Sequence, residues 1–217
     1  MQNSITPTAG AAVYDRHADG YDRRHKRFLR IAGNATQAAV EGMMSVVVRR
    51  GMRLLDAGCG TGRFGHFLRT LEPEIELTLL DASPAMLSYV SDEDARIIEG
   101  SLMDLPFLDG TFDAVVATWS LETLAEPALG LGELMRVIKP GGALCIAICV
   151  EPEHRVDVLT KWLMRRVHKK WFGQQQSVGL ICSTIRDLGG SDIRVRRDGA
   201  TAAIFCAEGR MPTFVGR

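Results

Sequence analysis

The stretch RLLDAGCGTGRFGHFL, residues 53–68, joins a short apolar run to a glycine-rich segment and then to a second apolar pattern. The leucines that end in Asp56 are typical of a short buried strand. Phe64, Phe67 and Leu68 recur at helical spacing, which predicts that a helix follows. The glycines therefore lie at a strand-to-helix turn, where backbone without side chains can contact a ligand closely.

The spacing of these glycines narrows the class of ligand. Gly58, Gly60 and Gly62 alternate with other residues, whereas the dinucleotide fingerprint G-x-G-x-x-G spaces its glycines unevenly. The following helix begins with Arg63, and the turn lacks the Lys-Ser/Thr ending of a phosphate-binding loop. The pattern therefore disfavours a dinucleotide, and the ligand need not contain phosphate.

The composition is that of an ordinary globular protein. The 217 residues are 46% apolar and 24% charged, enough for one good core. The 26 basic and 26 acidic residues cancel, so any preference for a charged partner must come from local clusters. The five cysteines form neither a C-x-x-C pair nor a group with zinc spacing, so we expect no disulfide scaffold and no metal site. With no leader-like or membrane-spanning apolar stretch, the sequence favours a cytoplasmic protein.

Strand-like runs alternate with helical stretches along the chain. Continuous apolar runs separated by helices predict a parallel sheet covered on both faces. The predicted strands of this kind are 53–56, 75–81, 95–100, 111–119 and 142–150. A helical preface with a helix over 35–49 precedes them, and a helix begins near 126 and is closed by the Lys-Pro-Gly-Gly run that ends at 142. Two β-like runs around Asp198-Gly199 predict a closing antiparallel hairpin.

Asp81 ends the second predicted strand, 25 residues beyond Asp56. In an open α/β sheet, ligands bind at the carboxyl ends of the strands, where a carboxylate can accept two hydrogen bonds from a ribose diol. Aspartate is also common as a helix cap, but the following Ser83-Pro84 supplies a helix start of its own. The ligand of the glycine turn is therefore predicted to contain a nucleoside.

Four ordered motifs resemble those of the class I S-adenosylmethionine-dependent methyltransferases. They are LLDAGCGTG (54–62), Asp81 at the end of the second strand, GSLMDLPFLDGTFDAVVA (100–117) and ELMRVIKPGGAL (133–144). The likeness is to the group that contains the ubiquinone and menaquinone C-methyltransferases and many small-molecule and phospholipid methyltransferases. It covers residues 50–150 closely, and YDRHADGYD (14–22) is similar to the N-terminal cap of that group.

The resemblance implies a fold, a cofactor and an organisation of the chain. The fold is an α/β, Rossmann-like, mostly parallel seven-stranded sheet with helices on both faces, a C-terminal antiparallel hairpin and a helical N-terminal cap. The cofactor implied by the resemblance is S-adenosylmethionine. The chain would be one methyltransferase domain with a helical cap (1–50), a cofactor-binding core (51–150), a basic lid helix (151–175), and a C-terminal helix and hairpin (176–217).

The resemblance also implies binding roles for the residues that match its motifs. The methionine and ribose parts of the cofactor would contact Asp56, Gly58, Gly60, Thr61 and Gly62, and the ribose hydroxyls would bind Asp81. The adenine would lie between Ala82 and Met86, although Met86 could equally be a core residue, and the methionine pocket would be walled by Tyr14 and Tyr21. Ser101 replaces an acid common in the family, so either its hydroxyl or the backbone of Leu102 and Met103 would bind the adenine edge.

Several residues expected near the methyl acceptor could instead have a purely structural role. Thr118 and Trp119 would lie between cofactor and substrate, although Trp119 could equally be a core aromatic. The methyl group of a sulfonium is already electrophilic, so a single catalytic residue need not exist. If the acceptor must lose a proton, the candidate bases are His154, Glu122 and the two cap tyrosines. His154 could instead be a solvated loop residue, and Glu122 could cap the helix that follows it.

The stretch HRVDVLTKWLMRRVHKKWFG, residues 154–173, predicts an amphipathic helix. Its apolar stripe consists of Val156, Leu159, Leu163 and Val167, and its other side carries Lys161, Arg165, Arg166, Lys169 and Lys170. Trp162 and Trp171 add amphipathic bulk. Such a helix could bind an anionic membrane surface, cover an acidic substrate, or expose a solvated basic face.

The leading predicted function is a methyltransferase that acts on a small-molecule or lipid substrate. No nucleic acid partner is expected, because the stretch ATWSLE (117–122) lacks the N-P-P-Y type of motif used for amino methylation of bases. One alternative is a phospholipid N-methyltransferase at an anionic membrane, with peripheral contact to the inner membrane face through residues 155–172. A second alternative is an S-adenosylmethionine-binding protein without catalysis.

Overall fold

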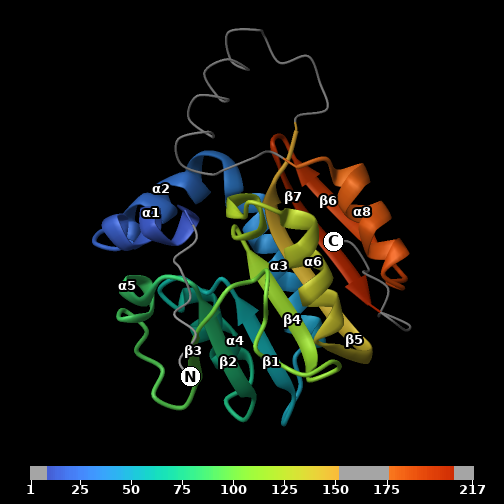
Figure 1. The fold of residues 1–217 in the computed structure, drawn as a ribbon, viewed down its shortest axis with the longest axis horizontal. Helices are drawn as coiled ribbons and strands as arrows, with labels where there is room; N and C mark the ends of the chain where they lie inside the picture. The colour runs from blue at the N-terminus through green and yellow to red at the C-terminus, as the bar shows by residue number, and fades with distance from the viewer. Residues whose placement is uncertain (1–8, 152–175, 208–217) are drawn as a thin grey trace, which may run out of the picture.

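The structure, a computed structural model, describes residues 9–151 and 176–207 (Figure 1). Its strands form one seven-stranded sheet in the order β3-β2-β1-β4-β5-β7-β6. They are β1 (Arg53–Ala57), β2 (Glu76–Asp81), β3 (Arg96–Glu99), β4 (Phe112–Thr118), β5 (Ile138–Cys149), β6 (Arg194–Asp198) and β7 (Thr201–Ala207). The first five strands pair in parallel, and β7 runs antiparallel between β5 and β6. The predicted fold class is confirmed.

The boundary between α6 (Pro127–Arg136) and β5 lies earlier than the sequence pattern predicts. The helix ends at Arg136, and Ile138 already pairs with Phe112 of β4. An irregularity in the register follows, and regular pairing resumes at Ala143. Pro140 suits this irregularity because it has no N–H to donate to a neighbouring strand. The prediction that the Lys-Pro-Gly-Gly run closes the helix is therefore wrong: the helix ends before it, and the run belongs to the beginning of β5.

The closing hairpin is confirmed, with its turn one residue further along than the sequence suggests. Asp198 pairs with Thr201, so the two-residue loop is Gly199–Ala200. Gly199 has a φ of 56°, a left-handed conformation that glycine adopts without strain. The hairpin turn therefore depends on Gly199, the residue that also predicted it.

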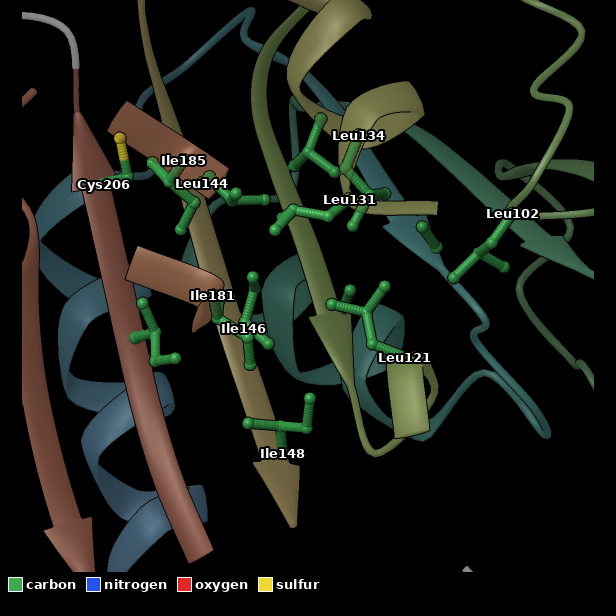
Figure 2. Close-up of a cluster of buried hydrophobic side chains, with 14 of the residues drawn as sticks. Leu102, Leu121, Leu131, Leu134, Leu144, Ile146, Ile148, Ile181, Ile185 and Cys206 are labelled. Atoms are coloured by element: carbon green, nitrogen blue, oxygen red, sulfur yellow. The ribbon is translucent and has the colours of Figure 1, made fainter. Parts of the chain in front are cut away.

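Helices cover both faces of the sheet, as predicted. On one face lie α3 (Asn34–Val47) and α4 (Arg63–Leu71), and on the other lie α6 and α8 (Val178–Asp187) (Figure 1). In the α6/α8 layer, buried leucines of α6 and isoleucines of α8 form one cluster with Ile146 of β5 (Figure 2). Burying one such side chain stabilises the fold by roughly 1.5–3 kcal/mol. The two layers thus hold the ends of the central strands in fixed positions.

The N-terminal preface folds as two helices, α1 (Ala9–His17) and α2 (Tyr21–Phe28). We call these two helices the cap. The chain leaves α2 through a π-helical turn, η1 (Leu29–Gly33), and continues directly into α3, which agrees with the helix predicted over 35–49. At its other end the cap reaches the carboxyl edge of the sheet, because α1 packs against α5 (Pro84–Leu87), the short helix after β2.

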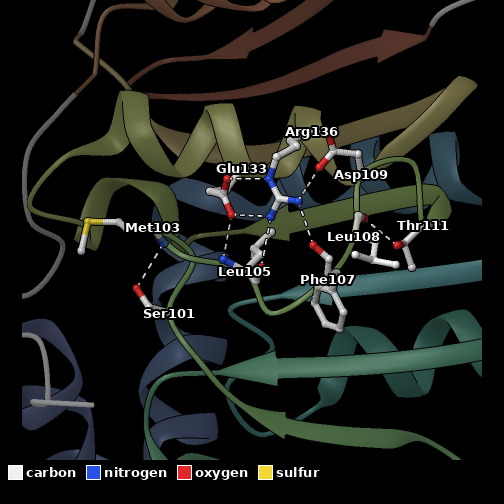
Figure 3. Close-up of polar contacts among 9 residues, drawn as sticks. All are labelled: Ser101, Met103, Leu105, Phe107, Leu108, Asp109, Thr111, Glu133 and Arg136. Carbon is white, nitrogen blue, oxygen red and sulfur yellow. Dashed lines mark hydrogen bonds and ion pairs between the residues drawn. The ribbon is translucent and has the colours of Figure 1, made fainter. Parts of the chain in front are cut away.

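Arg136, at the end of α6, holds the segment between β3 and β4 (Figure 3). Its guanidinium donates to the carbonyl oxygens of Phe107 at 2.7 Å and Leu105 at 3.1 Å, and it forms ion pairs with Asp109 and Glu133. Glu133 also accepts a hydrogen bond from the backbone N–H of Leu105 at 2.8 Å. These contacts fix a segment that has no regular structure of its own.

Replacing Arg136 by methionine is expected to destabilise the fold by about 2 kcal/mol, because backbone carbonyls and two carboxylates lose their donor. The free energy of unfolding, measured by urea denaturation, checks this. The matched control is Arg50→Met, since Arg50 pairs only at the surface, with Glu74. Equal effects of the two substitutions would show that the Arg136 contacts add nothing to stability.

Some sequence predictions fall outside the described residues. The basic stretch 154–173, with His154 and Trp162, is one of them. The domain boundaries at 50, 150 and 175 also stay predictions. Within 9–151 and 176–207, no helix is long and apolar enough to cross a membrane.

Candidate cofactor and acceptor site

The glycine turn after β1 has a backbone that only glycine adopts easily. The φ angles of Gly58, Gly60 and Gly62 are 75°, 55° and 77°. The N–H groups of Gly58 and Cys59 both donate to the carbonyl of Leu80 at the end of β2, at 2.7 and 3.0 Å. A Cβ atom at Gly58 would lie 2.5 Å from the Cβ of Ser120. The turn is therefore closely packed against the end of β2 and the loop after β4.

Asp81, the last residue of β2, faces the turn. Its Oδ2 accepts a hydrogen bond from the N–H of Gly60 at 2.7 Å, and its Oδ1 accepts one from the N–H of Ser83 at 2.9 Å. Burial raises the pKa of Asp81, while these backbone donors favour its charged form. Each carboxylate oxygen can accept two hydrogen bonds, so both can still accept from a ribose diol.

Asp56, at the carboxyl end of β1, is fully buried beside the first turn of α4. Neither of its carboxyl oxygens has a hydrogen-bond partner among the described residues. Burial raises the pKa of Asp56 to about 7. A buried carboxyl group without a partner is costly, so this position fits a ligand that brings hydrogen-bond donors or positive charge.

The residues predicted to hold the adenine come from α5 and from the segments that follow β2 and β3. The Met86 side chain of α5 is buried, and its Cε would be 3.1 Å from a Cβ atom at Gly60. Ala82 follows Asp81 and is half-buried, and Leu102 is a buried core residue. The Oγ of Ser101 accepts a hydrogen bond from the N–H of Met103 at 3.1 Å. An adenine contact with that N–H would therefore have to displace the Ser101 hydroxyl.

The cap brings both predicted tyrosines over the turn. Tyr21 begins α2, and its Cε1 would lie 3.8 Å from a Cβ atom at Gly60. The Tyr14 ring stands edge-on to it, with 6.1 Å between ring centroids. Burial raises the pKa of Tyr14 and of Tyr21 well above the ordinary value. Both hydroxyls therefore stay protonated at neutral pH, which suits pocket walls better than proton acceptors.

Two aspartates that the sequence analysis did not select attach the cap to the site. The carboxylate of Asp22 accepts a hydrogen bond from the Thr61 hydroxyl at 2.7 Å and lies 3.4 Å from Arg63. The carboxylate of Asp15 accepts one from the Ser83 hydroxyl at 2.5 Å. Both aspartates belong to the YDRHADGYD motif, but their partners are far away in the sequence.

Replacing Asp22 by asparagine is expected to loosen the cap, because the Thr61 and Arg63 contacts lose a charged acceptor. Amide hydrogen exchange over residues 12–28 should become about fivefold faster, equivalent to roughly 1 kcal/mol. Asp19→Asn, at an exposed position of the same segment, is the control. Unchanged exchange in the Asp22 variant would mean that this contact does not hold the cap closed.

An open cavity of about 360 Å³ adjoins the glycine turn between α2, α3 and α4. Its walls include Tyr21, His25, Phe64, Thr118 and Trp119. Burial, followed by the nearby Arg63, lowers the pKa of His25 to about 4, so this imidazole is neutral at neutral pH. Thr118 is the last residue of β4 and is half-buried. Aromatic rings thus form part of the cavity wall, which also includes the charged residues Glu41 and Arg63.

Trp119 is both a core residue and a wall of this cavity. Its side chain is buried, its ring stands edge-on to Phe28 with 5.0 Å between centroids, and its Nε1 donates to Oε1 of Gln37 at 2.9 Å. Its φ is 57°, which is costly for a bulky residue and clusters at functional sites. Packing in the core is therefore compatible with the other role that the sequence left open for Trp119, a position between cofactor and substrate.

Glu122 lies in a single helical turn after β4, η2 (Leu121–Thr123), and is fully buried. Its Oε1 accepts a hydrogen bond from the N–H of Cys149 at 3.2 Å, while its Oε2 has no partner among the described residues. The alternative that Glu122 caps the next helix is wrong, because that helix begins at Pro127 and is preceded by Glu126. The last predicted acceptor residue, His154, lies outside the described residues.

The strand order, the antiparallel seventh strand, the glycine turn and the acid ending β2 together define a class I S-adenosylmethionine-dependent methyltransferase fold. Residues 55–146 match the protein family described as "Methyltransferase domain". This segment is therefore a methyltransferase domain of the class I family.

Curated relatives carry related names. Demethylmenaquinone methyltransferase of Clavibacter sepedonicus is 32% identical over 148 residues, which cover 66% of this chain and 59% of that protein. The chloroplastic 2-methyl-6-phytyl-1,4-hydroquinone methyltransferase 2 of Oryza sativa subsp. japonica is 33% identical over 156 residues, 69% of this chain and 42% of that protein. The chain thus matches less than two thirds of the length of either relative.

Solved structures share the fold at low sequence identity. One is a SAM-dependent methyltransferase of Thermotoga maritima, titled a possible histamine N-methyltransferase, with a TM-score of 0.68 and 18% identity over 92% of this chain and 100% of that one. Another is phosphoethanolamine N-methyltransferase 2 of Haemonchus contortus with S-adenosyl-L-methionine, with a TM-score of 0.74 and 12% identity over 97% of this chain and 62% of that one. These likenesses establish the architecture.

Proposed function

We propose that this protein transfers the methyl group of S-adenosylmethionine to a small-molecule or lipid acceptor. The observation that carries the proposal is the pairing of Asp81 with the glycine turn, which places a carboxylate with free acceptor capacity beside bare backbone. This arrangement suits a nucleoside without a pyrophosphate. The matched methyltransferase family supports the reaction class.

The residues of the cleft fit this cofactor. We assign the ribose hydroxyls to Asp81, and the methionine part to Asp56, Gly58, Gly60, Thr61, Gly62, Thr118 and the cap tyrosines. We assign the adenine to the side formed by Ala82, Met86, Ser101, Leu102 and Met103. The unpartnered carboxyl oxygens of Asp56 match the positive charge that this cofactor carries. A Cβ atom at Gly58 or Gly60 would meet Ser120 or Met86, so only glycine lets the turn pack this closely.

Bound S-adenosylmethionine supplies an electrophilic methyl group. The protein must then hold the nucleophile in line with that group and keep water out. Tyr14 and Tyr21 cover the turn, and the Asp22 and Asp15 contacts hold them there. The aromatic walls around Trp119 can orient an apolar part of the acceptor. Positioning and exclusion of water therefore account for most of the expected rate enhancement.

Methyl transfer is tested with methyl-labelled S-adenosylmethionine and a panel of small-molecule and lipid acceptors. The expected result is acceptor-dependent formation of labelled product together with S-adenosylhomocysteine. Tight cofactor binding without turnover on any acceptor would favour the non-catalytic alternative. Absence of cofactor binding by folded protein would contradict the proposal as a whole.

We also propose that the acceptor side can face an anionic membrane. The sequence of 155–172 supports this by its cations, and the exposed face of α2 adds Arg23, Arg24, Lys26 and Arg27. Each cation near an anionic bilayer adds about 1 kcal/mol. Replacing Arg165, Arg166, Lys169 and Lys170 by glutamine should therefore reduce sedimentation with anionic liposomes strongly, with unchanged cofactor affinity. Wild-type protein that ignores such liposomes at low salt would exclude this contact.

A further inference from the structure

The loop after β4 is held tightly against the glycine turn. The hydroxyl of Ser120 donates to the carbonyl of Ala57 at 3.2 Å, and its Cβ occupies the space that a side chain at Gly58 would need. Glu122 comes two residues later and is anchored on its far side by the N–H of Cys149, the last residue of β5. These two contacts fix Ser120 on the glycine turn and the Glu122 carboxyl at the end of β5.

Structural support requires only one of the two carboxyl oxygens of Glu122. Oε1 makes the bond to Cys149, while Oε2 is buried without a hydrogen-bond partner among the described residues. An unpaired buried oxygen of a carboxyl group is destabilising, and glutamine could make the same bond to the N–H of Cys149. The free oxygen therefore points to a role beyond packing.

The titratable side chains around Glu122 are phenols and a thiol, which bring no positive charge to balance its ionised carboxylate. The titratable groups that face it are Tyr14 of α1, Tyr21 of α2 and Cys149 of β5. Within the described part of the chain, none of the groups that influence Glu122 is a cation. Burial raises the pKa of Glu122 to about 7, which suits a group that exchanges a proton at neutral pH.

We propose that the acceptor carries an O–H or N–H on the atom that is methylated, and that Oε2 of Glu122 accepts this proton. The proposal rests on the proposed methyl transfer and names its acceptor class: alcohols, phenols and neutral amines. The two cap tyrosines are poor proton acceptors because their hydroxyls are held protonated, so among the candidate bases within residues 9–151 and 176–207 the proposal falls on Glu122, whose charge acts on both tyrosines.

The atoms and charges of the step balance. The O–H or N–H bond of the acceptor breaks and its proton goes to Oε2, while the bond from oxygen or nitrogen to the methyl carbon forms. The bond from the methyl carbon to sulfur breaks, and its electron pair stays on sulfur, which becomes a neutral thioether. The positive charge of the sulfonium and the negative charge of the carboxylate disappear together. An anionic acceptor such as a thiolate needs no base and would be repelled by the ionised carboxylate.

The first test needs no acceptor. In protein saturated with S-adenosylhomocysteine, the carboxyl carbon of Glu122 is followed by ¹³C NMR from pH 5 to 9, and its signal is assigned by its absence in Glu122→Gln. We expect a titration near pH 7. A signal that does not titrate in this range would overturn the proposal. Failure of the wild type to bind S-adenosylhomocysteine would instead contradict the proposed function.

The second test compares nucleophiles on one scaffold: 1-naphthol, 1-naphthylamine and 1-naphthalenethiol with labelled donor. We expect methylation of the hydroxyl or amine, a kcat that rises with pH through about 7, and a loss of at least about hundredfold in Glu122→Gln with unchanged donor affinity. The control is Glu126→Gln, an exposed acid in the same loop. Transfer to the thiol alone, or a kcat for Glu122→Gln within threefold of wild type, would overturn the proposal. If none of the three probes is methylated, the ¹³C NMR titration of Glu122 alone decides whether the proposal stands.

Discussion

Replacing Asp81 by alanine is expected to weaken the binding of S-adenosylhomocysteine about thirtyfold. The substitution removes the acceptor proposed for the ribose hydroxyls and also releases the N–H groups of Gly60 and Ser83. Loss of such charge-assisted hydrogen bonds costs about 2 kcal/mol, which corresponds to this change in Kd. Isothermal titration calorimetry of the folded variant measures the effect directly.

The control for this variant is Asp113→Ala. Asp113 lies near the beginning of β4, at the opposite edge of the sheet, where it pairs with Lys139 and accepts from the N–H of Arg53. Its loss removes the same charge and lowers stability without touching the cleft. Affinity unchanged in the Asp81 variant, or reduced equally in both, would remove Asp81 from the ribose site.

The second large effect is expected for Gly60→Val, which should reduce cofactor affinity more than about hundredfold. The left-handed φ of 55° is strained for a β-branched residue, and the new Cβ would be only 3.1 Å from the Met86 side chain. A valine there would also fill the space between Met86 and Tyr21 that we assign to the ligand. A loss of about 3 kcal/mol of binding corresponds to this factor.

The control variant Gly51→Val separates the effect of backbone strain from the effect of a side chain that enters the proposed ligand site. Gly51 has a φ of 72°, but a Cβ atom there would meet nothing within 4 Å, and it precedes β1 at the far edge of the sheet. This variant should lose stability and keep its affinity for S-adenosylhomocysteine. If Gly60→Val bound the cofactor as tightly as Gly51→Val, the proposed position of the ligand over the turn would be wrong.

The fold was predictable because its signals are local. The apolar runs that end in Asp56 and Asp81 are continuous, so each identifies a buried parallel strand without knowledge of its neighbours. The glycines identify the turn for the same reason, since their left-handed conformations depend on the turn itself. The start of β5 was misplaced because the pairing of Ile138 with Phe112 depends on contacts across the sheet.

The details of the site could be predicted only in part. Asp15 and Asp22 bind partners about forty or more positions away, so nothing in their own motif distinguishes them from exposed acids. The left-handed backbone of Trp119 and the unpartnered oxygen of Glu122 result from how the loop after β4 packs on the glycine turn. The family resemblance selected Trp119, and its position after the fourth strand selected Glu122, but packing determines what each can do.

Binding of S-adenosylmethionine over the glycine turn is tested most directly by calorimetric titration of the purified protein with S-adenosylhomocysteine, S-adenosylmethionine and NAD⁺. We expect that the first two bind at one site per chain, that they compete with each other, and that NAD⁺ does not displace them, because the glycine spacing is not that of a dinucleotide-binding turn. Binding of NAD⁺ at the same site with comparable affinity, or no binding of either methionine-derived ligand to folded protein, would contradict it.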